Sequence, residues 1–406
     1  MRIFAAVRHS SDPTQFYGGL WSANFYPALR ELGHEIIESQ TDLLATSQFM
    51  EVAAGFTSEE LAVRGETTER ILDEVKAGLR RGPIDLFLSY FYNAHFDPAG
   101  FDELRRLGVP SVNFFCNSLY QFPLVAGIAA RTDVSWHSER DGAPLYSAVG
   151  ATPVWVQMGA DPLVCHPVAT ATRQPRACFA GQRYADRDRW AAALLQADLP
   201  LDLYGSGWGA AVATIDVMEP DLPVYLGRRR LRAGSGPAYA RAAGDAIRSQ
   251  GLSAGLARLV RQRRYRVETA RLTPLLEQSA KGRSSSLSDT FAQYEVVLNF
   301  SNVWADGRPG SALIPHVRLR DFEGPMSRTC YVTGHTDEIA EFYDLGREID
   351  TYRTAAELID KTRYYLGHPA AAERLRDAGY KRAVNDHTWR RRFKTLFAKI
   401  GLPAAA

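Results

Sequence analysis

The sequence predicts an α/β protein with two Rossmann-like domains, each built around a parallel sheet. Short apolar runs, such as Arg2–Val7 and Tyr294–Asn299, alternate with segments of helical spacing, which is the pattern of repeated βαβ units. The alternation restarts at Arg176, after the polar stretch Ala169–Pro175, which we expect to be a linker. A length of 406 residues suggests two or three domains. We therefore expect domains at residues 1–168 and 176–386, a linker at 169–175 and a final helix within 387–406.

The composition is that of an ordinary globular protein, with 46% hydrophobic and 23% charged residues. A formal net charge of +2 gives no reason to expect a nucleic-acid partner. Four scattered cysteines lack the spacing of a metal site and the density of a secreted disulfide framework. The N-terminus enters a strand at once, and no apolar run is long enough to cross a membrane. We expect a cytoplasmic protein without a metal site or a transmembrane segment.

A glycine pair follows the first predicted strand. Gly18 and Gly19 precede a segment of helical spacing, Asn24–Leu32, which Gly33 would end. Two glycines permit positive φ and a close approach of the backbone to a ligand at a helix start. The spacing is not that of the Gly-x-Gly-x-x-Gly dinucleotide motif. A ligand-binding loop and an ordinary strand-to-helix turn are therefore both open.

Four titratable side chains lie where strands of the first domain end. His95 and Asp97 follow one predicted strand, and His137 and Glu139 lie at the end of another. Ligands of open α/β sheets sit beyond the carboxyl ends of the strands, so these residues are candidates for a general base. A lone histidine at such a place is more often structural, and both interpretations remain open.

Two strand exits of the second domain carry glycine: Gly181-Gln182-Arg183 and Tyr204-Gly205-Ser206-Gly207-Trp208. Glycines there allow the backbone to approach a phosphate or the edge of a base. The alternative is a tight exit from a strand with no ligand.

The stretch from Asn299 to Gly334 reads as strand, polar loop, short helix and strand. Arg320 and Glu323 are three residues apart, so they share one face of that helix. A guanidinium and free backbone N–H groups can bind phosphate, and a carboxylate can accept hydrogen bonds from a sugar diol. The alternative is an ordinary amphipathic helix with a solvated Arg–Glu pair.

This stretch resembles the C-terminal half of the CgeB-like (spore maturation protein) glycosyltransferases of the GT-B superfamily. The resemblance rests on Leu298-Asn299, on Arg320-x-Phe322-Glu323 and on the strand Tyr331-Val332-Thr333, and it continues to His387-Thr388-Trp389. It implies two Rossmann-like domains whose sheets face a cleft. A nucleotide-sugar donor would bind the second domain, and a hydroxyl- or amine-bearing acceptor the first. The terminal helix would cross back to the first domain.

The resemblance also implies roles for residues. Glu323 would bind the ribose, Arg320 would lie near the diphosphate with Arg183 and the Gly181 loop, and Tyr204 and Gly205 would border the base. The full donor-binding set is Gly18, Gly19, Gly181, Gln182, Arg183, Tyr204, Gly205, Ser206, Asn299, Arg318, Arg320, Phe322 and Glu323. The chain departs from the family where it has Pro315 in place of a glutamate of many retaining relatives, and in Pro325-Met326-Ser327-Arg328.

Residues 228–286 interrupt a connection that is short in most relatives. They hold fourteen basic residues but only the acids Asp245, Glu268 and Glu277. Ala238–Arg248 and Leu252–Leu276 have helical spacing, so we expect a basic helical insertion. It could bind an anionic acceptor, a membrane surface or a partner, or it could be a solvated appendage or an oligomer contact. No aromatic stripe supports nucleic-acid binding.

The sequence and the resemblance together predict glycosyl transfer, with a nucleotide-diphosphate sugar as co-substrate and no other cofactor. Arginines and backbone N–H groups would stabilise the leaving diphosphate without a bound metal. Two alternatives stay open, a nucleotide-sugar epimerase on the same fold and a catalytically silent sugar-nucleotide-binding protein. The residues do not distinguish retention from inversion.

Overall fold

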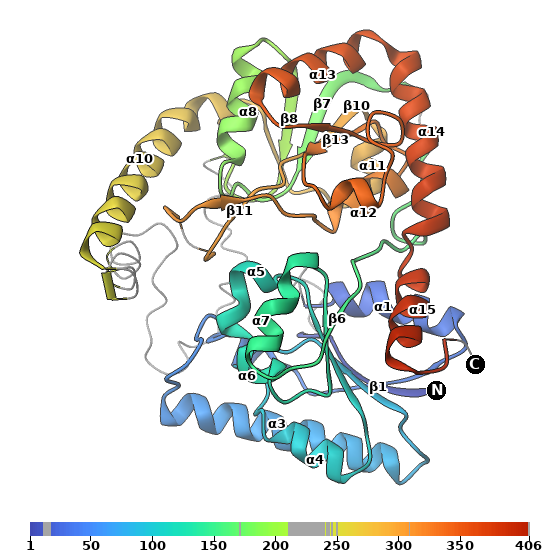
Figure 1. Cartoon of the computed structure of the whole chain (residues 1–406). Coiled ribbons are helices and arrows are strands. Elements are labelled where there is room, and N and C mark those ends of the chain that lie inside the picture. Colours follow the sequence, from blue (N-terminus) through green and yellow to red (C-terminus); the bar gives the residue numbers. More distant parts are fainter. Residues whose placement is uncertain are drawn as a thin grey trace. The chain divides into compact units, whose positions relative to one another are not determined.

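A computed structural model describes residues 1–10, 18–169, 172–209, 251–307 and 309–404, together with residues 240, 244, 247 and 248. These residues form two compact units (Figure 1). The first unit contains residues 1–161 and 388–404, and the second contains residues 162–387, within the described ranges. Each unit has a six-stranded sheet, and the strand pairs are parallel. The predicted class of two Rossmann-like parallel sheets is confirmed.

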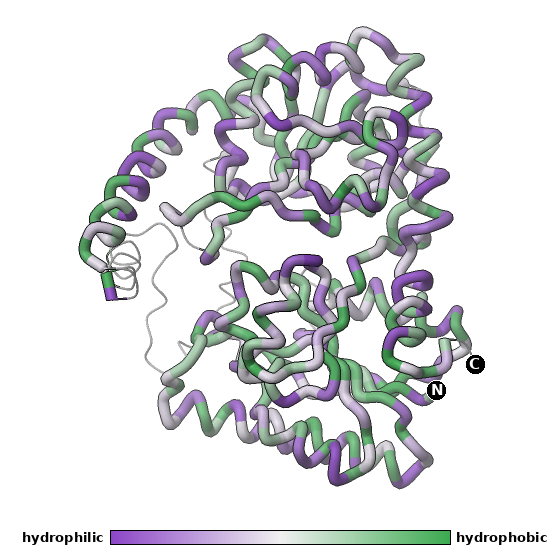
Figure 2. The backbone as a smooth tube through the Cα atoms, in the orientation of Figure 1, coloured by the Kyte–Doolittle hydropathy of each residue, from purple (hydrophilic) through white to green (hydrophobic). Residues whose placement is uncertain are grey.

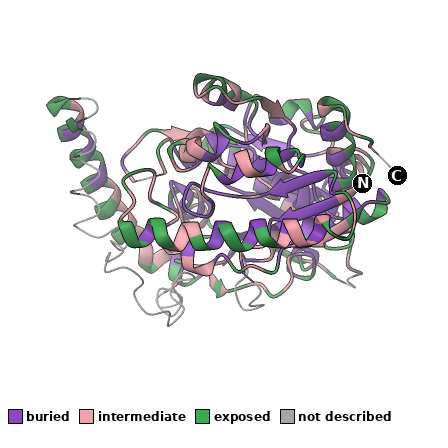
Figure 3. Ribbon diagram, turned by 90° about the horizontal axis from the view of Figure 1, so that it is seen from below, coloured by how far each residue is buried: buried purple, intermediate pink, exposed green. Residues whose placement is uncertain are grey.

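The sheet of the first unit has the order β2-β1-β3-β4-β5-β6. Its strands are β1 (Arg2–Ala6), β2 (Glu35–Glu38), β3 (Leu86–Ser89), β4 (Ser111–Phe115), β5 (Val134–His137) and β6 (Pro153–Trp155). Most of these residues are buried (Figure 3), as expected for a parallel sheet covered on both faces. The direction in which the strands are added reverses between β1 and β3, and open sheets bind ligands at such a switch point.

Helices complete the first unit. They are α1 (Leu20–Glu31), α2 (Leu44–Ser47), α3 (Ser58–Leu79), α4 (Gly100–Arg106), α5 (Ser118–Gln121), α6 (Ala126–Ala129), α7 (Ala143–Ala148) and α15 (Trp389–Ile400). The helix α15 packs beside α1. Its buried Trp389 donates from Nε1 to Oδ1 of Asn24 at 2.8 Å and meets the ring of Phe25 edge to face. This residue ties the end of the chain to the core of the first unit.

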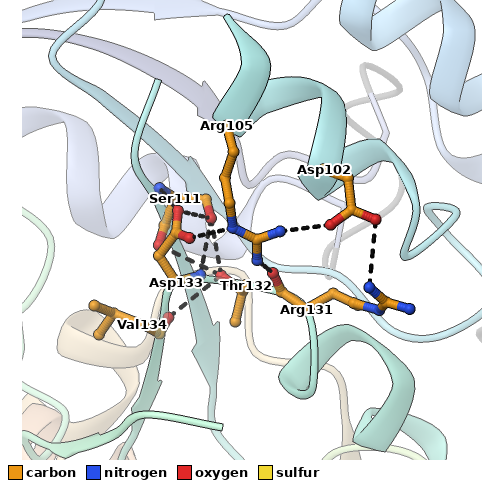
Figure 4. Close-up of polar contacts among 7 residues, drawn as sticks. All are labelled: Asp102, Arg105, Ser111, Arg131, Thr132, Asp133 and Val134. Carbon is orange, nitrogen blue, oxygen red and sulfur yellow. Dashed lines mark hydrogen bonds and ion pairs between the residues drawn. The ribbon is translucent and has the colours of Figure 1, made fainter. Parts of the chain in front are cut away.

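A polar cluster closes the amino ends of β4 and β5 (Figure 4). Asp133 accepts from the backbone N–H and the hydroxyl of Ser111, both at 2.8 Å. Its other oxygen accepts from Nε of Arg105 in α4 at 2.7 Å. Because ligands bind at the opposite edge of such sheets, this cluster stabilises the fold and is no candidate for the site.

The sheet of the second unit has the order β14-β13-β10-β7-β8-β9. Its strands are β7 (Gln174–Ala180), β8 (Leu201–Tyr204), β9 (Ala280–Gly282), β10 (Tyr294–Asn299), β13 (Tyr331–Gly334) and β14 (Asp350–Tyr352). In order of appearance these strands are arranged 3-2-1-4-5-6, which is the Rossmann order. The switch point therefore lies between β7 and β10.

The remaining elements of the second unit among the described residues are six α-helices, a 3-10 helix at Ile339–Glu341 and a two-stranded hairpin. They are α8 (Arg187–Gln196), α10 (Leu252–Glu277), α11 (Leu287–Ala292), α12 (Arg320–Met326), α13 (Ala355–Gly367), α14 (Pro369–Asp386), β11 (Val303–Trp304) and β12 (Leu313–Ile314). The core gathers Phe179, Leu203, Val296, Leu298 and Val332 from the strands. Neither unit contains, in its described part, a helix long and apolar enough to cross a membrane.

The region 228–286, expected as a basic helical insertion, is described at residues 240, 244, 247 and 248 and from residue 251 onward. Its long helix α10 packs against α8, and Arg189 of α8 pairs with Glu268 at 2.7 Å. The region also includes β9, which pairs with β8 in the sheet. The helix expected at Ala238–Arg248 lies mostly outside the described residues. The part from 251 to 286 is thus joined to the sheet and to α8.

We expect Asp133→Ala to lower the free energy of unfolding by about 1–3 kcal/mol, since it leaves the buried Ser111 amide without its acceptor. Asp102→Ala is the matched control, because Asp102 pairs with the exposed guanidinium groups of Arg105 and Arg131 and should cost about 0–1 kcal/mol. Urea unfolding of the two variants measures the difference. Equal losses would contradict the role assigned to the Ser111 bonds.

Candidate functional site

The loops that leave β7 and β10 are joined at the switch point of the second unit. Arg187, the first residue of α8, is buried. It donates to the carbonyl of Gln182 at 2.7 Å and to that of Phe300 at 3.3 Å. Asn302 in turn donates to Asp186 at 2.7 Å. The two strand exits therefore form one rigid edge.

Positive charge gathers at this edge. Arg318 donates from Nη2 to the carbonyl of Asn302 at 3.3 Å, and it forms no ion pair with any carboxylate in the described ranges. Burial first, and then the charges of Arg318 and Arg187, hold the pKa of His316 well below its usual value. His316 is therefore neutral at neutral pH. A guanidinium without a carboxylate partner, beside a second one, is suited to an anionic ligand.

Asp321 holds this arrangement together from inside. Its Oδ1 accepts from the hydroxyls of Thr333 at 2.8 Å and Tyr331 at 3.0 Å and from Nδ2 of Asn299 at 3.1 Å. Its Oδ2 accepts from the backbone N–H of Arg318 at 2.7 Å. Burial raises the pKa of Asp321, and these hydrogen bonds oppose that shift. One carboxylate thereby connects β10, β13, α12 and the turn that carries Arg318.

Arg320 and Glu323 lie on one face of α12, as their spacing predicts. Nη1 of Arg320 is paired with Oε2 of Glu323, and the Glu323 side chain is only 8% exposed. No described residue donates a hydrogen bond to the other oxygen, Oε1. Phe322 is fully buried against the rings of Phe342 and His387. The motif thus combines a core residue with a carboxylate that keeps one oxygen available.

The two glycine-containing exits brace each other. Gly205 has φ of +119°, and a Cβ there would lie 2.4 Å from the carbonyl oxygen of Gly181, so only glycine fits. The backbone N–H of Arg183 donates to the carbonyl of Ser206 at 2.9 Å. The hydroxyl of Tyr204 lies 2.8 Å from that of Tyr294.

The side chains of Gln182 and Arg183 have different surroundings. Gln182 is exposed. The guanidinium of Arg183 donates to the carbonyl of Thr269 at 2.7 Å and to the hydroxyl of Thr273 at 3.0 Å, both in α10. It also lies 3.4 Å from Asp188. These contacts favour a positioning role for Arg183 and leave Gln182 open to a ligand.

In the first unit, the switch point between β1 and β3 carries His9. Nε2 of His9 donates to the carbonyl of Tyr90 at 2.7 Å, and the two rings stack with centroids 4.9 Å apart. Its backbone N–H donates to the carbonyl of Gly18 at 2.8 Å. Gly19 precedes α1 with φ of −105°, so the positive φ that glycine permits is not used there. The glycine pair supports His9 through a carbonyl.

The four sequence-predicted titratable residues of this unit all have protein partners. Nδ1 of the buried His95 accepts from the backbone N–H of Tyr92 at 3.1 Å, and burial holds its pKa well below the usual value. Asp97 pairs with Arg64 at 3.2 Å.

The second pair is equally engaged. Nδ1 of His137 lies 2.9 Å from the carbonyl of Glu139, and burial lowers the pKa of His137 to about 4. Glu139 accepts from the backbone N–H of Ser118 and, at 3.1 Å, from that of Leu119, which anchors the start of α5. Both pairs support loops at the carboxyl edge of the sheet.

Four residues of these sites were not predicted from the sequence: His9, Arg187, His316 and Asp321. The signal for His9 is its place at the end of the first strand. Arg187 opens the first helix after the linker. Asp321 is the variable residue of the Arg320-x-Phe322-Glu323 motif, and nothing in the neighbouring sequence indicates that its side chain is buried. In the described ranges no three His, Cys, Asp or Glu side chains form a group that could hold a metal ion.

We expect Asp321→Asn to lower the free energy of unfolding by about 1–3 kcal/mol. Both carboxylate oxygens of Asp321 accept hydrogen bonds, and in asparagine an NH2 group would replace one of them and face a donor. Asp337→Asn is the control, since that carboxylate is 84% exposed. Thermal and urea unfolding compare the two. A cost for Asp321→Asn no larger than for the control would refute the central role of this carboxylate.

Comparison with known proteins concerns the family and the fold. Residues 259–398 match the family model described as glycosyl transferase-like, while no curated protein matches the sequence. Sucrose-phosphate synthase (tll1590) from Thermosynechococcus elongatus is similar in structure, with 12% identity, a TM-score of 0.56 and 99% of each chain covered.

Two further solved structures are similar along nearly the whole chain. A glycosyltransferase from Rickettsia africae ESF-5 has 11% identity and a TM-score of 0.55, with 98% of this chain and 97% of that chain covered. Anabaena Alr3699/HepE in complex with UDP and glucose has 10% identity and a TM-score of 0.53, with coverages of 98% and 99%. Residues 259–398 are therefore similar to glycosyl transferases, and the similarity to the solved structures shows that the two Rossmann-like units have a fold that glycosyltransferases also use.

Proposed function

We propose that the second unit binds the nucleoside diphosphate of a sugar donor at the edge formed by β7 and β10. The observation that carries this proposal is Arg318, a cation with no carboxylate partner among the described residues, beside Arg187 at the switch point. Both positive charges can stabilise a diphosphate. The Anabaena structure, described as a complex with UDP and glucose, supports a nucleotide ligand for this fold.

The proposal assigns the sugar of the nucleoside to Glu323. Its Oε1 would accept from the vicinal ribose hydroxyls while Oε2 stays paired with Arg320. Gly181, Gln182 and Ser206 would line the same edge, and Tyr204 with Gly205 would border the base. Arg183, Asn299 and Phe322 would hold the loops in place. Within the glycosyltransferases, the motif on α12 supports a place in the CgeB-like group.

The proposed reaction joins an acceptor oxygen or nitrogen to the anomeric carbon of the donor sugar. The bond from that carbon to the diphosphate oxygen breaks, and the nucleoside diphosphate leaves with the bonding electrons. Fixed guanidinium groups stabilise the charge that develops on the leaving oxygen without reorganising. We propose that these groups fill the role without a metal ion.

The first unit would bind the acceptor, and His9 would accept its proton. Nε2–H of His9 is committed to the Tyr90 carbonyl, so Nδ1 carries the lone pair. Burial lowers the pKa of His9 to about 4, which keeps the imidazole neutral at neutral pH. His95, Asp97, His137 and Glu139 would position the loops around it.

Donor binding is tested by calorimetry, after a thermal-shift panel of nucleoside diphosphates has selected the base. We expect Arg318→Gln and Glu323→Ala each to weaken the nucleotide about tenfold to hundredfold, since each removes charge-assisted hydrogen bonds. Glu323→Gln should fall between the wild type and Glu323→Ala. The control is Arg347→Gln, an arginine that is 84% exposed and paired with Asp344. Unchanged dissociation constants in folded variants would refute the donor site.

Turnover is tested as release of nucleoside diphosphate from the sugar nucleotide. A transferase releases it only with an acceptor, an epimerase changes the sugar instead, and a silent binding protein does neither. We expect His9→Asn to lower kcat about a hundredfold or more with nucleotide affinity unchanged. Because the neutral imidazole is the active form, wild-type turnover should be constant near neutral pH and fall as the pH drops through about 4.

The control for His9 is His95→Asn. We expect this variant to lower the free energy of unfolding and to change kcat less than His9→Asn does. Wild-type kcat in His9→Asn would remove His9 from the mechanism.

A further inference from the structure

The outer face of α10 is the main exposed apolar surface of the described structure. Ten large hydrophobic side chains are exposed in the described ranges, and six of them cluster on and just before this helix: Ile247, Leu252, Leu256, Leu259, Val260 and Val267. Leu252 is 65% exposed and Val267 is 63% exposed. Scattered single residues of this kind are normal, but a contiguous group marks a surface that contacts something.

The sequence of α10 arranges these residues in a row. At about 100° per residue, Leu252, Leu256, Val260 and Val267 lie on one side of the helix, with Leu259 at its edge and Arg263 among them. Arg264 and Arg271 border the row on one side, and Arg266 borders it on the other. Figure 2 shows hydrophobic and hydrophilic residues alternating along this helix. A helix face that carries leucine and valine together with arginine can lie at an anionic membrane surface, because arginine side chains extend to the headgroups.

A groove runs beside this row, between α8 and α10. It has a volume of about 680 Å³ and is lined by Leu272, Val267 and five charged residues, Arg189, Arg263, Arg264, Glu268 and Arg271. Glu268 is engaged by Arg189 at 2.7 Å. The other three arginines form no ion pair with a carboxylate in the part of the chain that the structure describes. The groove is therefore positively charged and open to an anion.

We propose that α10 docks on an anionic phospholipid surface. The leucine and valine row would enter the boundary between headgroups and acyl chains, and the arginines of the groove would bind lipid phosphates. Exposed apolar side chains and arginines lie together on α10, and the groove for anions lies between α10 and α8. The inference stands apart from the proposed reaction, because none of these residues belongs to the donor or acceptor sites.

The charge of α10 argues for lipid over the alternatives. The helix carries six arginines and two glutamates, so a second copy packed face to face would bring like charges together. An RNA surface would need aromatic platforms for stacking. The single aromatic residue of α10, Tyr265, packs edge to face on Trp304 with centroids 5.2 Å apart. Cationic residues near an anionic membrane gain about 1 kcal/mol each, or about fivefold in binding.

Cosedimentation of the full-length chain with vesicles tests the proposal. Vesicles of phosphatidylcholine alone are compared with vesicles of equal parts phosphatidylcholine and phosphatidylglycerol, at low and at high salt. We expect binding only to the anionic vesicles, weakened by salt. Inorganic phosphate at matched ionic strength should compete no better than chloride, which separates a lipid surface from a site for free phosphate.

Two double variants address the two halves of the surface. Leu256→Ser with Val260→Ser removes apolar contact, and Arg264→Glu with Arg271→Glu reverses two charges. Each should weaken vesicle binding more than about tenfold. The matched controls are Leu61→Ser, a leucine 44% exposed on α3, and Arg347→Glu. Both controls should bind as the wild type does, and circular dichroism and nucleotide binding should be unchanged throughout.

Three outcomes would overturn the proposal. Wild-type protein could fail to bind anionic vesicles at low salt. The double variants could bind as tightly as the controls. Alternatively, light scattering could reveal a wild-type oligomer that Leu256→Ser with Val260→Ser dissociates, which would show that a second copy covers the row. Failure of donor binding in the Arg318 and Glu323 experiments leaves this inference untouched, because the readouts are separate.

Discussion

The buried carboxylate of Asp321 is the interaction on which the candidate donor site depends. It accepts from two strands and from the turn that carries Arg318. A buried charge is costly unless its hydrogen bonds are complete, and here both oxygens are engaged. The carboxylate therefore holds the backbone of Arg318 in place, and the first turn of α12 comes immediately after it in the chain. The orientation of Arg320 and Glu323 is thereby linked to the core of the sheet.

Sheet topology explains why so few residues can form either site. In a parallel sheet the loops of the carboxyl edge are brought together at the point where the strand order reverses. In the second unit this selects the exits of β7 and β10 and hence Arg187 and Arg318. In the first unit it selects the exits of β1 and β3 and hence His9. Residues at other exits, such as His137 and Glu139, reach the same edge but support neighbouring loops.

The fold was largely predictable from the sequence because strands and helices have local patterns. The terminal helix lies at Trp389–Ile400 as expected, and Tyr294–Asn299 is a strand. The helix expected from Asn24 begins at Leu20, since the glycine before it ends the loop sooner than the apolar spacing shows. The sites were less predictable. Arg183 and Arg318 look alike in the sequence, and only the tertiary partners, two threonines of α10 for one and a lone carbonyl for the other, separate them.

The helix α10 contacts the loop after β7 with one face and carries the proposed lipid-binding surface on the other. Its inner face carries Thr269 and Thr273, which bind the guanidinium of Arg183 in the loop after β7. Its outer face carries the apolar row and Arg263, Arg264 and Arg271, which pair with no carboxylate of the described residues. The loop that precedes α8 and Arg187 is therefore joined to this helix by hydrogen bonds. A helix held on one side by the donor loop and on the other by an anionic surface would fix that loop in one position. Docking would then order the edge where the diphosphate is proposed to bind, without any change in the residues that contact it.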